Sequence, residues 1–240
     1  YLLFALVFSG LVLAENNLSI SAIIMFVAFI IVFSEGMSGK ITGILMGLGG
    51  IGVLIAIFTS GYRMKRFISF INPWKYATDE GYQLVHSLYA IGTGGLFGVG
   101  LGNSKQKALY MPEPHNDFIF AIICEELGLI GAIIIISVFL VLIIAGINVA
   151  MRAKDKYGRL LATGIISVIA VQVVINIAVV TGSMPVTGVP LPFISYGGTS
   201  LVFNLAAIGV LLNISSQTKT HKDEIQEKIE RKRIKSKMNI

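Results

Sequence analysis

The feature that most constrains this chain is a series of long apolar runs that contain almost no charged residues. Several runs have 18 or more residues, which is enough for a helix to cross a hydrocarbon core of about 30 Å. Hydrophobic residues make up 55% of the 240 residues and charged residues only 13%. A soluble domain of this size does not have that balance. The sequence therefore predicts an all-α, polytopic membrane protein.

Hydropathy predicts six transmembrane helices. The first is short and begins at Tyr1 without an initiator Met, so we interpret the chain as the later part of a longer protein. The fourth is longer than a bilayer requires, and we expect it to tilt or to project beyond the membrane. The transmembrane domain covers residues 1–215, with spans at 1–14, 18–34, 41–60, 118–149, 160–180 and 195–214.

Basic residues orient these spans. The tail, residues 216–240, holds eight Lys and Arg, and the connector 151–159 holds four, so the positive-inside rule places both in the cytoplasm. Residues 61–115 then form a large external loop. That loop nevertheless has six basic residues, which indicates an anionic ligand: Arg63, Lys65, Arg66, Lys75, Lys105 and Lys107.

Part of this loop is neither a normal loop nor a normal span. Its segment HSLYAIGTGGLFGVGLG, residues 86–102, is too apolar for a free loop and too rich in glycine for a good spanning helix. We expect a re-entrant or interfacial segment, because irregular backbone at membrane depth is tolerated where it lines a cavity within the protein. The glycines match no nucleotide-binding spacing, which argues against bound ATP or NAD.

Acidic residues lie at the entrance of the fourth span. Asp117 follows Pro112 and Pro114, so we expect it in the first turn of that helix, either as a cap or as a functional group near the loop cations. Glu125 and Glu126 lie about 12–13 Å further along the helix. That is too far for the paired carboxylates of a glycosidase, which need about 5–9.5 Å. We expect both to pair with polar groups on neighbouring helices, or with residues of the part of the protein that precedes Tyr1.

The remaining candidates are cations and glycines. Arg63 and Arg66 are spaced i,i+3 and should face one way. With Lys105 and Lys107 they could clamp phosphates, although long basic side chains also snorkel to lipid headgroups. Residues 185–200, PVTGVPLPFISYGGTS, predict a rigid re-entrant turn, with a close helix crossing at Gly197 and Gly198. The single cysteine, Cys124, allows no disulfide framework.

Three long motifs carry a family resemblance: GYQLVHSLYAIGTGGLFGVGLGNSKQK, PEPHNDFIFAIICEELGLIG and PVTGVPLPFISYGGTSLVFNLAAIGVLLNIS. They resemble the SEDS family (shape, elongation, division and sporulation) over residues 18–215. The run LGNSKQK favours the FtsW/SpoVE branch over RodA. Asn116 stands where the family often has Thr, and ENNLS at residues 15–19 stands where it has a PDLGT-like motif.

The resemblance implies a ten-helix SEDS fold, of which this chain holds about the last six helices. It implies a peptidoglycan glycosyltransferase of the bacterial inner membrane that polymerises lipid II in division, sporulation or elongation. The implied partners are a class B penicillin-binding protein and other division or elongation membrane proteins, with no nucleic acid. The essential acidic residue of the family's external loop falls on Asp117.

Transfer from an α-linked sugar pyrophosphate to form a β-1,4 bond requires inversion by the acceptor hydroxyl. We expect Asp117 to act as the base, or as the ligand of a divalent cation such as Mg²⁺ or Mn²⁺; no cofactor is otherwise indicated. The candidates for binding the pyrophosphate and headgroup are Arg63, Arg66, Lys105, Lys107 and Gln83.

Two other functions fit the same residues. A lipid II flippase would also use intramembrane acids and broken helices. It should place its ionisable groups near the midplane, whereas the cations and Asp117 cluster at the external mouth; Glu125 and Glu126, deeper in, keep this alternative open. A non-catalytic scaffold that recruits the transpeptidase would need the apolar faces of the spans but not the acidic group.

Overall fold

The computed structural model describes residues 2–113 and 115–217 of the chain. Within these ranges the chain forms eight α-helices, a 3-10 helix and a π-helix, and no strand. The predicted cytoplasmic tail, from residue 218 on, lies outside the described residues. The elements are α1 (Leu2–Ala14), α2 (Leu18–Ser34), α3 (Gly39–Phe58), α4 (Gly61–Ile71), η1 (Pro73–Tyr76), α5 (Tyr82–Gly94), η2 (Gln106–Tyr110), α6 (Ile119–Arg152), α7 (Lys156–Val180) and α8 (Gly198–Ser216).

The six predicted spans coincide with α1, α2, α3, α6, α7 and α8. Four of them, α3, α6, α7 and α8, are long and apolar enough to cross a membrane, and α1 and α2 are shorter apolar helices. In α3 and α8 only 6% of the best apolar window is buried inside the protein. Such a surface suits lipid, and the prediction of an all-α polytopic membrane protein is confirmed.

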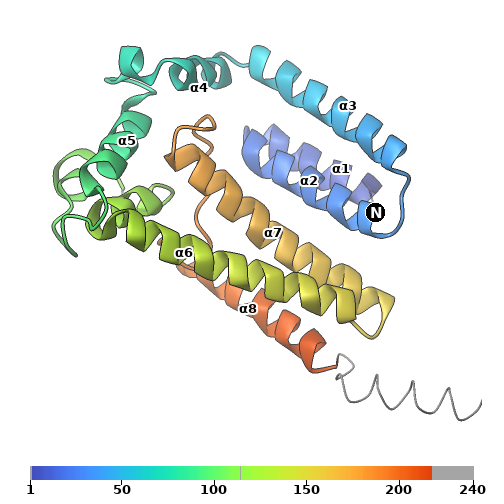
Figure 1. Ribbon diagram of the computed structural model, residues 1–240. Helices are drawn as coiled ribbons and strands as arrows, with labels where there is room; N and C mark the ends of the chain where they lie inside the picture. Colours follow the sequence, from blue (N-terminus) through green and yellow to red (C-terminus); the bar gives the residue numbers. More distant parts are fainter. Residues whose placement is uncertain (1, 114, 218–240) are drawn as a thin grey trace, which may run out of the picture.

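The apolar helices lie side by side, and the segment between α3 and α6 gathers at one end of them (Figure 1). That segment is not an open loop, because it holds α4, η1, α5 and η2. The turns between α2 and α3 and between α6 and α7 lie at the opposite end (Figure 1). There Glu35 accepts hydrogen bonds from Lys156 and Arg159 and joins the two turns.

The long fourth span is interrupted inside α6. Gly128 has φ 67° and ψ −167°, so the helix is broken between residues 119–127 and residues 129–152. The chain after α5 fills the break: Val99 N–H donates to the Glu125 carbonyl (2.9 Å), and Leu129 N–H donates to the Gly95 carbonyl (2.9 Å). The backbone groups that the break leaves free are hydrogen-bonded to a glycine-rich loop. Irregular backbone near lipid needs such partners.

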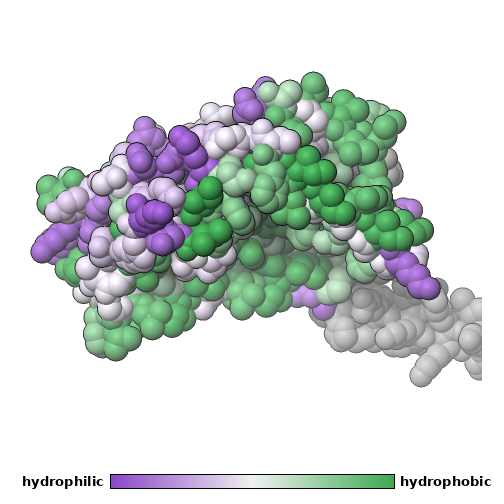
Figure 2. Space-filling view, turned by 90° about the horizontal axis from the view of Figure 1, so that it is seen from above, coloured by the Kyte–Doolittle hydropathy of each residue, from purple (hydrophilic) through white to green (hydrophobic). Residues whose placement is uncertain are grey.

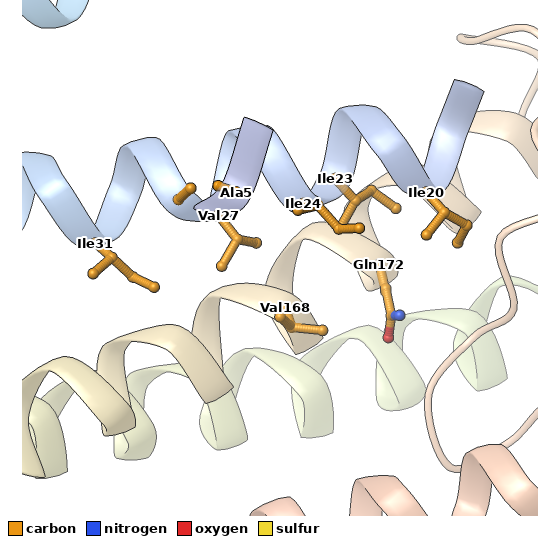
Figure 3. A pocket seen from close by; sticks show the side chains of 9 residues that line it. Ala5, Ile20, Ile23, Ile24, Val27, Ile31, Val168 and Gln172 are labelled. Atoms are coloured by element: carbon orange, nitrogen blue, oxygen red, sulfur yellow. The ribbon is translucent and has the colours of Figure 1, made fainter. Parts of the chain in front are cut away.

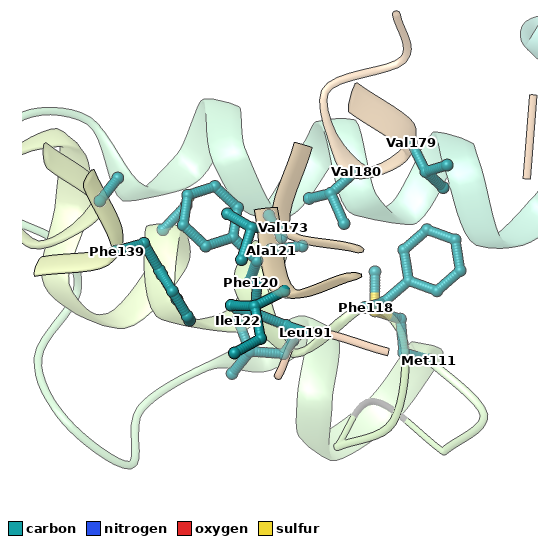
Figure 4. Packing of buried hydrophobic residues seen from close by; sticks show 14 residues of the cluster. Met111, Phe118, Phe120, Ala121, Ile122, Phe139, Val173, Val179, Val180 and Leu191 are labelled. Carbon is teal, nitrogen blue, oxygen red and sulfur yellow. The ribbon is translucent and has the colours of Figure 1, made fainter. Parts of the chain in front are cut away.

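The main core packs where α5, α6 and α7 meet the turn before α8 (Figure 4). Phe120, Val180 and Leu191 are each no more than 2% exposed. Since lipid tails are as apolar as these side chains, close packing and hydrogen bonds hold such helices together more than the hydrophobic effect does. Phe118 belongs to this core and is 2% exposed, so its packing anchors the backbone next to Asp117.

A second feature of the bundle is an apolar cavity of about 350 Å³ between α1, α2 and α7 (Figure 3). Its lining includes Ile20, Ile24, Ile31 and Val168, and Gln172 is its one amide side chain. Gln172 lies one helical turn before Asn176 on α7. The helix α7 therefore carries both part of the cavity wall and Asn176.

Candidate active site around Asp117

Asp117 lies just before α6 rather than in its first turn. The helix begins at Ile119, its N-cap residue is Phe118, and no side chain caps it. The predicted position is therefore corrected by two residues. The reason is that the backbone carbonyl of Asp117 accepts a hydrogen bond from Asn176 Nδ2 (2.7 Å) instead of entering the helical pattern. The carboxyl group has no capping role and is available for chemistry.

Asn176 connects Asp117 to the turn before α8. It is 1% exposed in the apolar helix α7, and its Nδ2 also donates to the carbonyl oxygen of Val189 (2.8 Å). Sequence reasoning missed this residue. The available signal was an amide in the middle of an apolar span, where such side chains usually hydrogen-bond across helices.

The turn before α8 also holds the two residues preceding Asp117. Ser195 Oγ donates to the carbonyl of Asn116 (2.7 Å), and Tyr196 N–H donates to the carbonyl of His115 (2.8 Å). Together with Asn176, these contacts fix the backbone of residues 115–117. A segment that sequence reasoning treated as structural therefore forms one wall of the candidate site.

The close helix crossing predicted at Gly197 and Gly198 is not found within residues 2–113 and 115–217. A Cβ atom built on Gly198 would meet nothing within 4 Å, and one on Gly197 would meet only Ser200, at 3.5 Å. The glycine that approaches the candidate site is Gly188, at φ +70°, whose added Cβ would lie 3.9 Å from Asp117 Oδ2. These glycines shape the turn rather than a helix contact.

Arg66 is the cation that acts on Asp117. On α4, its Nη1 donates to the carbonyl of Val186 (3.3 Å), and its guanidinium lies 4.6 Å from the centre of the Tyr62 ring. Burial raises the pKa of Asp117 above the ordinary value. A hydrogen bond from its own backbone and the charge of Arg66 oppose that rise, and the charge of Glu113 adds to it.

A polar cavity of about 390 Å³ opens beside Arg66. It lies between α4, the start of α5 and the turn before α8, and Gln83 is part of its wall. The structure thus brings together two of the predicted binding residues, Arg66 and Gln83. Hydrophilic side chains gather at this end of the molecule, while hydrophobic ones cover the region of α3 (Figure 2). Its other lining residues are Tyr62, Thr78, Asp79, Glu80, Tyr82, Pro112 and Val186.

The predicted clamp of four cations is not assembled at this cavity. Arg63 lies one turn before Arg66, but its Nη1 donates to the carbonyl of Ala56 at the end of α3 (3.1 Å). Lys105 and Lys107 do not line the cavity and lie beside Glu125 and Glu126. Equal spacing on a helix does not make two long side chains share a partner, because each reaches the nearest free acceptor.

Glu125 has a different partner from the predicted one. It is 1% exposed and accepts hydrogen bonds from Ser104 Oγ, from Lys105 N–H (3.1 Å) and from Gln106 N–H (3.3 Å). These donors belong to the loop that enters η2, not to a neighbouring spanning helix. A carboxylate at this place satisfies N–H groups at a helix start. Glu125 is therefore a clasp between α6 and the loop that leads to Asp117.

Glu126 is held less firmly. Its carboxylate lies 4.0 Å from Lys107 Nζ, whose side chain is half exposed. One carboxyl oxygen, Oε1, is buried and has no hydrogen-bond partner among the described residues. Glu126 thus makes one long ion pair, whereas Glu125 accepts hydrogen bonds from three donors.

A divalent cation does not fit the donor set. Over residues 2–113 and 115–217, no three His, Cys, Asp or Glu side chains come together as metal ligands. Burial raises the pKa of Asp117, and the charge that opposes this rise comes from Arg66. The mechanism proposed below therefore uses no metal ion. The arrangement is one half-buried carboxyl group and, within reach of its charge, one guanidinium that lines a polar cavity.

Residues 1–220 match the family model FtsW/RodA/SpoVE, described as "Cell cycle protein". The chain is 47% identical over 214 residues to stage V sporulation protein E of Bacillus subtilis, covering 88% of this chain and 58% of that protein. It is 44% identical over 219 residues to a probable peptidoglycan glycosyltransferase FtsW of Geobacter sp. (strain M18), covering 90% and 59%. The chain spans less than two thirds of these relatives.

Solved structures show the same arrangement of helices. A chain from a study titled "Structural coordination of polymerization and crosslinking by a peptidoglycan synthase complex" aligns with a TM-score of 0.74 and 27% identity, over 91% of this chain and 61% of that one. The rod shape determining protein RodA of Thermus thermophilus aligns with a TM-score of 0.59 and 26% identity, over 91% and 56%.

Proposed function

This chain belongs to the FtsW/RodA/SpoVE family of cell cycle proteins, and from that premise we propose that it forms part of a peptidoglycan glycosyltransferase that polymerises lipid II. The observation that carries the proposal is the half-buried carboxyl group of Asp117, whose burial raises its pKa against the charge of Arg66, a residue that lines a polar cavity. Two similar proteins support the assignment: one is named a probable peptidoglycan glycosyltransferase, and the other was solved in a study of a peptidoglycan synthase complex.

The proposed step is an inverting sugar transfer. A hydroxyl oxygen of the acceptor sugar attacks the anomeric carbon of the donor and forms the new C–O bond. The bond from that carbon to the phosphate oxygen breaks, and the polyprenyl pyrophosphate leaves with its electron pair. The Asp117 carboxylate takes the hydroxyl proton as general base, a role that its raised pKa favours.

Arg66 supplies the positive charge in this step. Its guanidinium opens on the cavity and would stabilise the negative charge that develops on the departing pyrophosphate. Its hydrogen bond to the Val186 carbonyl fixes its direction before substrate arrives. Gln83, in the same wall, would orient a sugar or phosphate group by hydrogen bonding.

The apolar cavity of Figure 3 fits the other half of such a substrate. It lies beside Gln172, one turn of α7 from Asn176, which holds the Asp117 backbone. A lipid tail could enter between α1, α2 and α7 while its polar headgroup reaches Arg66. We place the Asp117 face outside the inner membrane, and we expect a class B penicillin-binding protein as partner, in division or sporulation.

The flippase alternative draws no support from Glu125. Transport would need Glu125 to change partners as the substrate passes. Its carboxylate is instead buried and saturated by the loop at residues 104–106. The scaffold alternative does not account for a half-buried carboxyl group under the charge of a guanidinium that lines a polar cavity.

The test is polymerisation of purified lipid II by the complete protein with its penicillin-binding partner. We expect glycan strands from the wild type and at least a 100-fold lower rate from Asp117→Ala at equal folding. Glu15→Gln, an exposed acid in the turn between α1 and α2, is the matched control and should polymerise normally. Strands from Asp117→Ala at the wild-type rate would refute the catalytic role, and no strands from the wild type would refute the glycosyltransferase.

A further inference from the structure

One face of α5 carries a row of aromatic side chains. Tyr82, His86 and Tyr89 are spaced i, i+4 and i+7, which places them on the same side of the helix. The opposite side is buried, with Leu84 and Val85 at most 3% exposed. The helix is thus fixed against the bundle by its apolar side and presents its rings outward.

Two rings from neighbouring elements extend this row. Trp74 of η1 packs edge-on to Tyr89, with ring centres 5.5 Å apart, and Tyr110 of η2 stacks on His86 at 5.3 Å with an angle of 10°. The ring centres of Tyr82 and His86 are 4.3 Å apart. Trp74, Tyr89 and Tyr110 remain 55%, 47% and 48% exposed. We call these five residues the aromatic row.

Polar contacts hold the row in place. His86 Nδ1 and Gln106 Oε1 are 2.7 Å apart, and the Tyr82 hydroxyl donates to the carbonyl of Tyr110 (2.7 Å). Gln106 is buried and its N–H donates to Glu125. The rings are therefore organised before any ligand arrives, which reduces the entropy lost on binding.

The row leads into the candidate active site. Tyr82, at its end, lines the same polar cavity as Gln83 and Arg66. From Tyr82 to Tyr89 the row follows about 10 Å of helix axis at 1.5 Å per residue, which is enough to contact more than one sugar ring. A linear ligand on the row would have its end at the cavity.

We propose that the aromatic row binds the glycan strand and guides its end to the polar cavity, an inference that rests on the proposed function. A pyranose ring has an apolar face of C–H groups and a polar edge of hydroxyl and amide groups. Aromatic side chains with a polar end suit such amphipathic ligands. A membrane-interface belt of Trp and Tyr is the competing explanation. The glycan is favoured because the row is continuous with a polar cavity and lies on η1, α5 and η2 instead of on spanning helices.

Trp74 is the only tryptophan in this 240-residue sequence, and the part of the emission that Trp74→Phe removes reports on the row. The complete protein in lipid nanodiscs would be titrated with a soluble tetrasaccharide of alternating N-acetylglucosamine and N-acetylmuramic acid. We expect a saturable change in tryptophan emission that is lost in Trp74→Phe. In Tyr89→Ala and Tyr110→Ala the apparent Kd should rise at least fivefold.

Tyr157→Ala is the matched control, because Tyr157 is 74% exposed at the start of α7 and outside the row. Its Kd should equal that of the wild type. No saturable change in the wild type, or the same Kd in all variants, would overturn the inference. So would Trp74 emission that responds only to quencher lipids labelled at the headgroup, which would identify a membrane belt.

Polymerisation by the same wild-type preparation separates the two proposals. Strands without tetrasaccharide binding would overturn only the role of the aromatic row. Tetrasaccharide binding without strands would overturn the glycosyltransferase and leave the row as a glycan-binding surface.

Discussion

The side-chain amide of Asn176, in an apolar stretch of α7, donates a 2.7 Å hydrogen bond to the backbone carbonyl of Asp117. The same Nδ2 atom donates to the Val189 carbonyl (2.8 Å), so one side chain joins the candidate catalytic residue to the turn before α8. The direction of the Asp117 carboxyl group thus depends on a residue 59 positions later in the chain.

Replacing Asn176 should therefore loosen the site as well as the fold. Asn176→Ala leaves the buried Val189 carbonyl and the partly buried Asp117 carbonyl without this donor, and we expect a loss of about 2 kcal/mol in the free energy of unfolding and a fall in kcat. Thermal unfolding and lipid II polymerisation measure the two effects. Asn204→Ala is the control, because its amide makes one exposed contact of 3.4 Å to Ser200 in α8. Equal losses in both variants would contradict the bridging role.

The pH dependence of polymerisation should follow the charges around Asp117. A general base must be deprotonated, so activity falls as the pH drops through the pKa of Asp117. Arg66→Gln removes a charge that lowers this pKa and should move the acid limb to higher pH. Glu113→Gln removes a charge that raises it and should move the limb to lower pH.

Profiles of log kcat/KM against pH for the two variants would show these opposite displacements. Arg63→Gln is the control, since Arg63 bonds to the end of α3 and should leave the position of the acid limb unchanged. If the acid limbs of Arg66→Gln and Glu113→Gln moved in the same direction, Asp117 would be excluded as the titrating base.

Loss of the Glu125 clasp should free the loop around η2. Glu125→Gln replaces an oxygen that accepts hydrogen bonds with a donor, and hydrogen bonds to charged groups contribute about 1.5–3 kcal/mol each. We expect amide hydrogen exchange over residues 104–111 to speed up at least tenfold. Glu126→Gln, which loses only a 4.0 Å ion pair, should leave that exchange nearly unchanged. If the two variants exchange alike, the clasp does not hold the loop.

The break in α6 should tolerate only glycine. Gly128 has a backbone conformation that side chains rarely adopt, and an added Cβ would lie 2.5 Å from the Leu96 carbonyl oxygen. Gly128→Ala should cost about 1–3 kcal/mol in backbone strain and displace the loop at residues 95–100. The unfolding midpoint in detergent should fall accordingly.

Gly43 in α3 provides the comparison, because a Cβ there would meet nothing within 4 Å. In a regular helix, Gly→Ala is favourable by about 1 kcal/mol, so Gly43→Ala should not lower the midpoint. A midpoint for Gly128→Ala equal to that of the wild type would mean that the break relaxes without strain.

Some of the site could be predicted from local sequence. The prolines before Asp117 placed the carboxyl group at the entrance of a spanning helix, and the error was only two residues. Asn176 could have been recognised as an amide inside an apolar span. In contrast, the i,i+3 spacing of Arg63 and Arg66 gave the wrong grouping, because their partners, Ala56 and Val186, lie in different parts of the chain.

The sequence by itself determined the class of fold and the positions of the spans. In lipid, a long uncharged segment must satisfy its own backbone, so apolar runs become helices wherever they occur. Only the tertiary structure decided that α6 breaks at Gly128, that Glu125 holds the loop into η2, and that Arg66 is the one of the four predicted cations whose charge acts on the pKa of Asp117. Each of these depends on hydrogen bonds or charges between residues distant in sequence, and neither hydropathy nor helical spacing records such contacts.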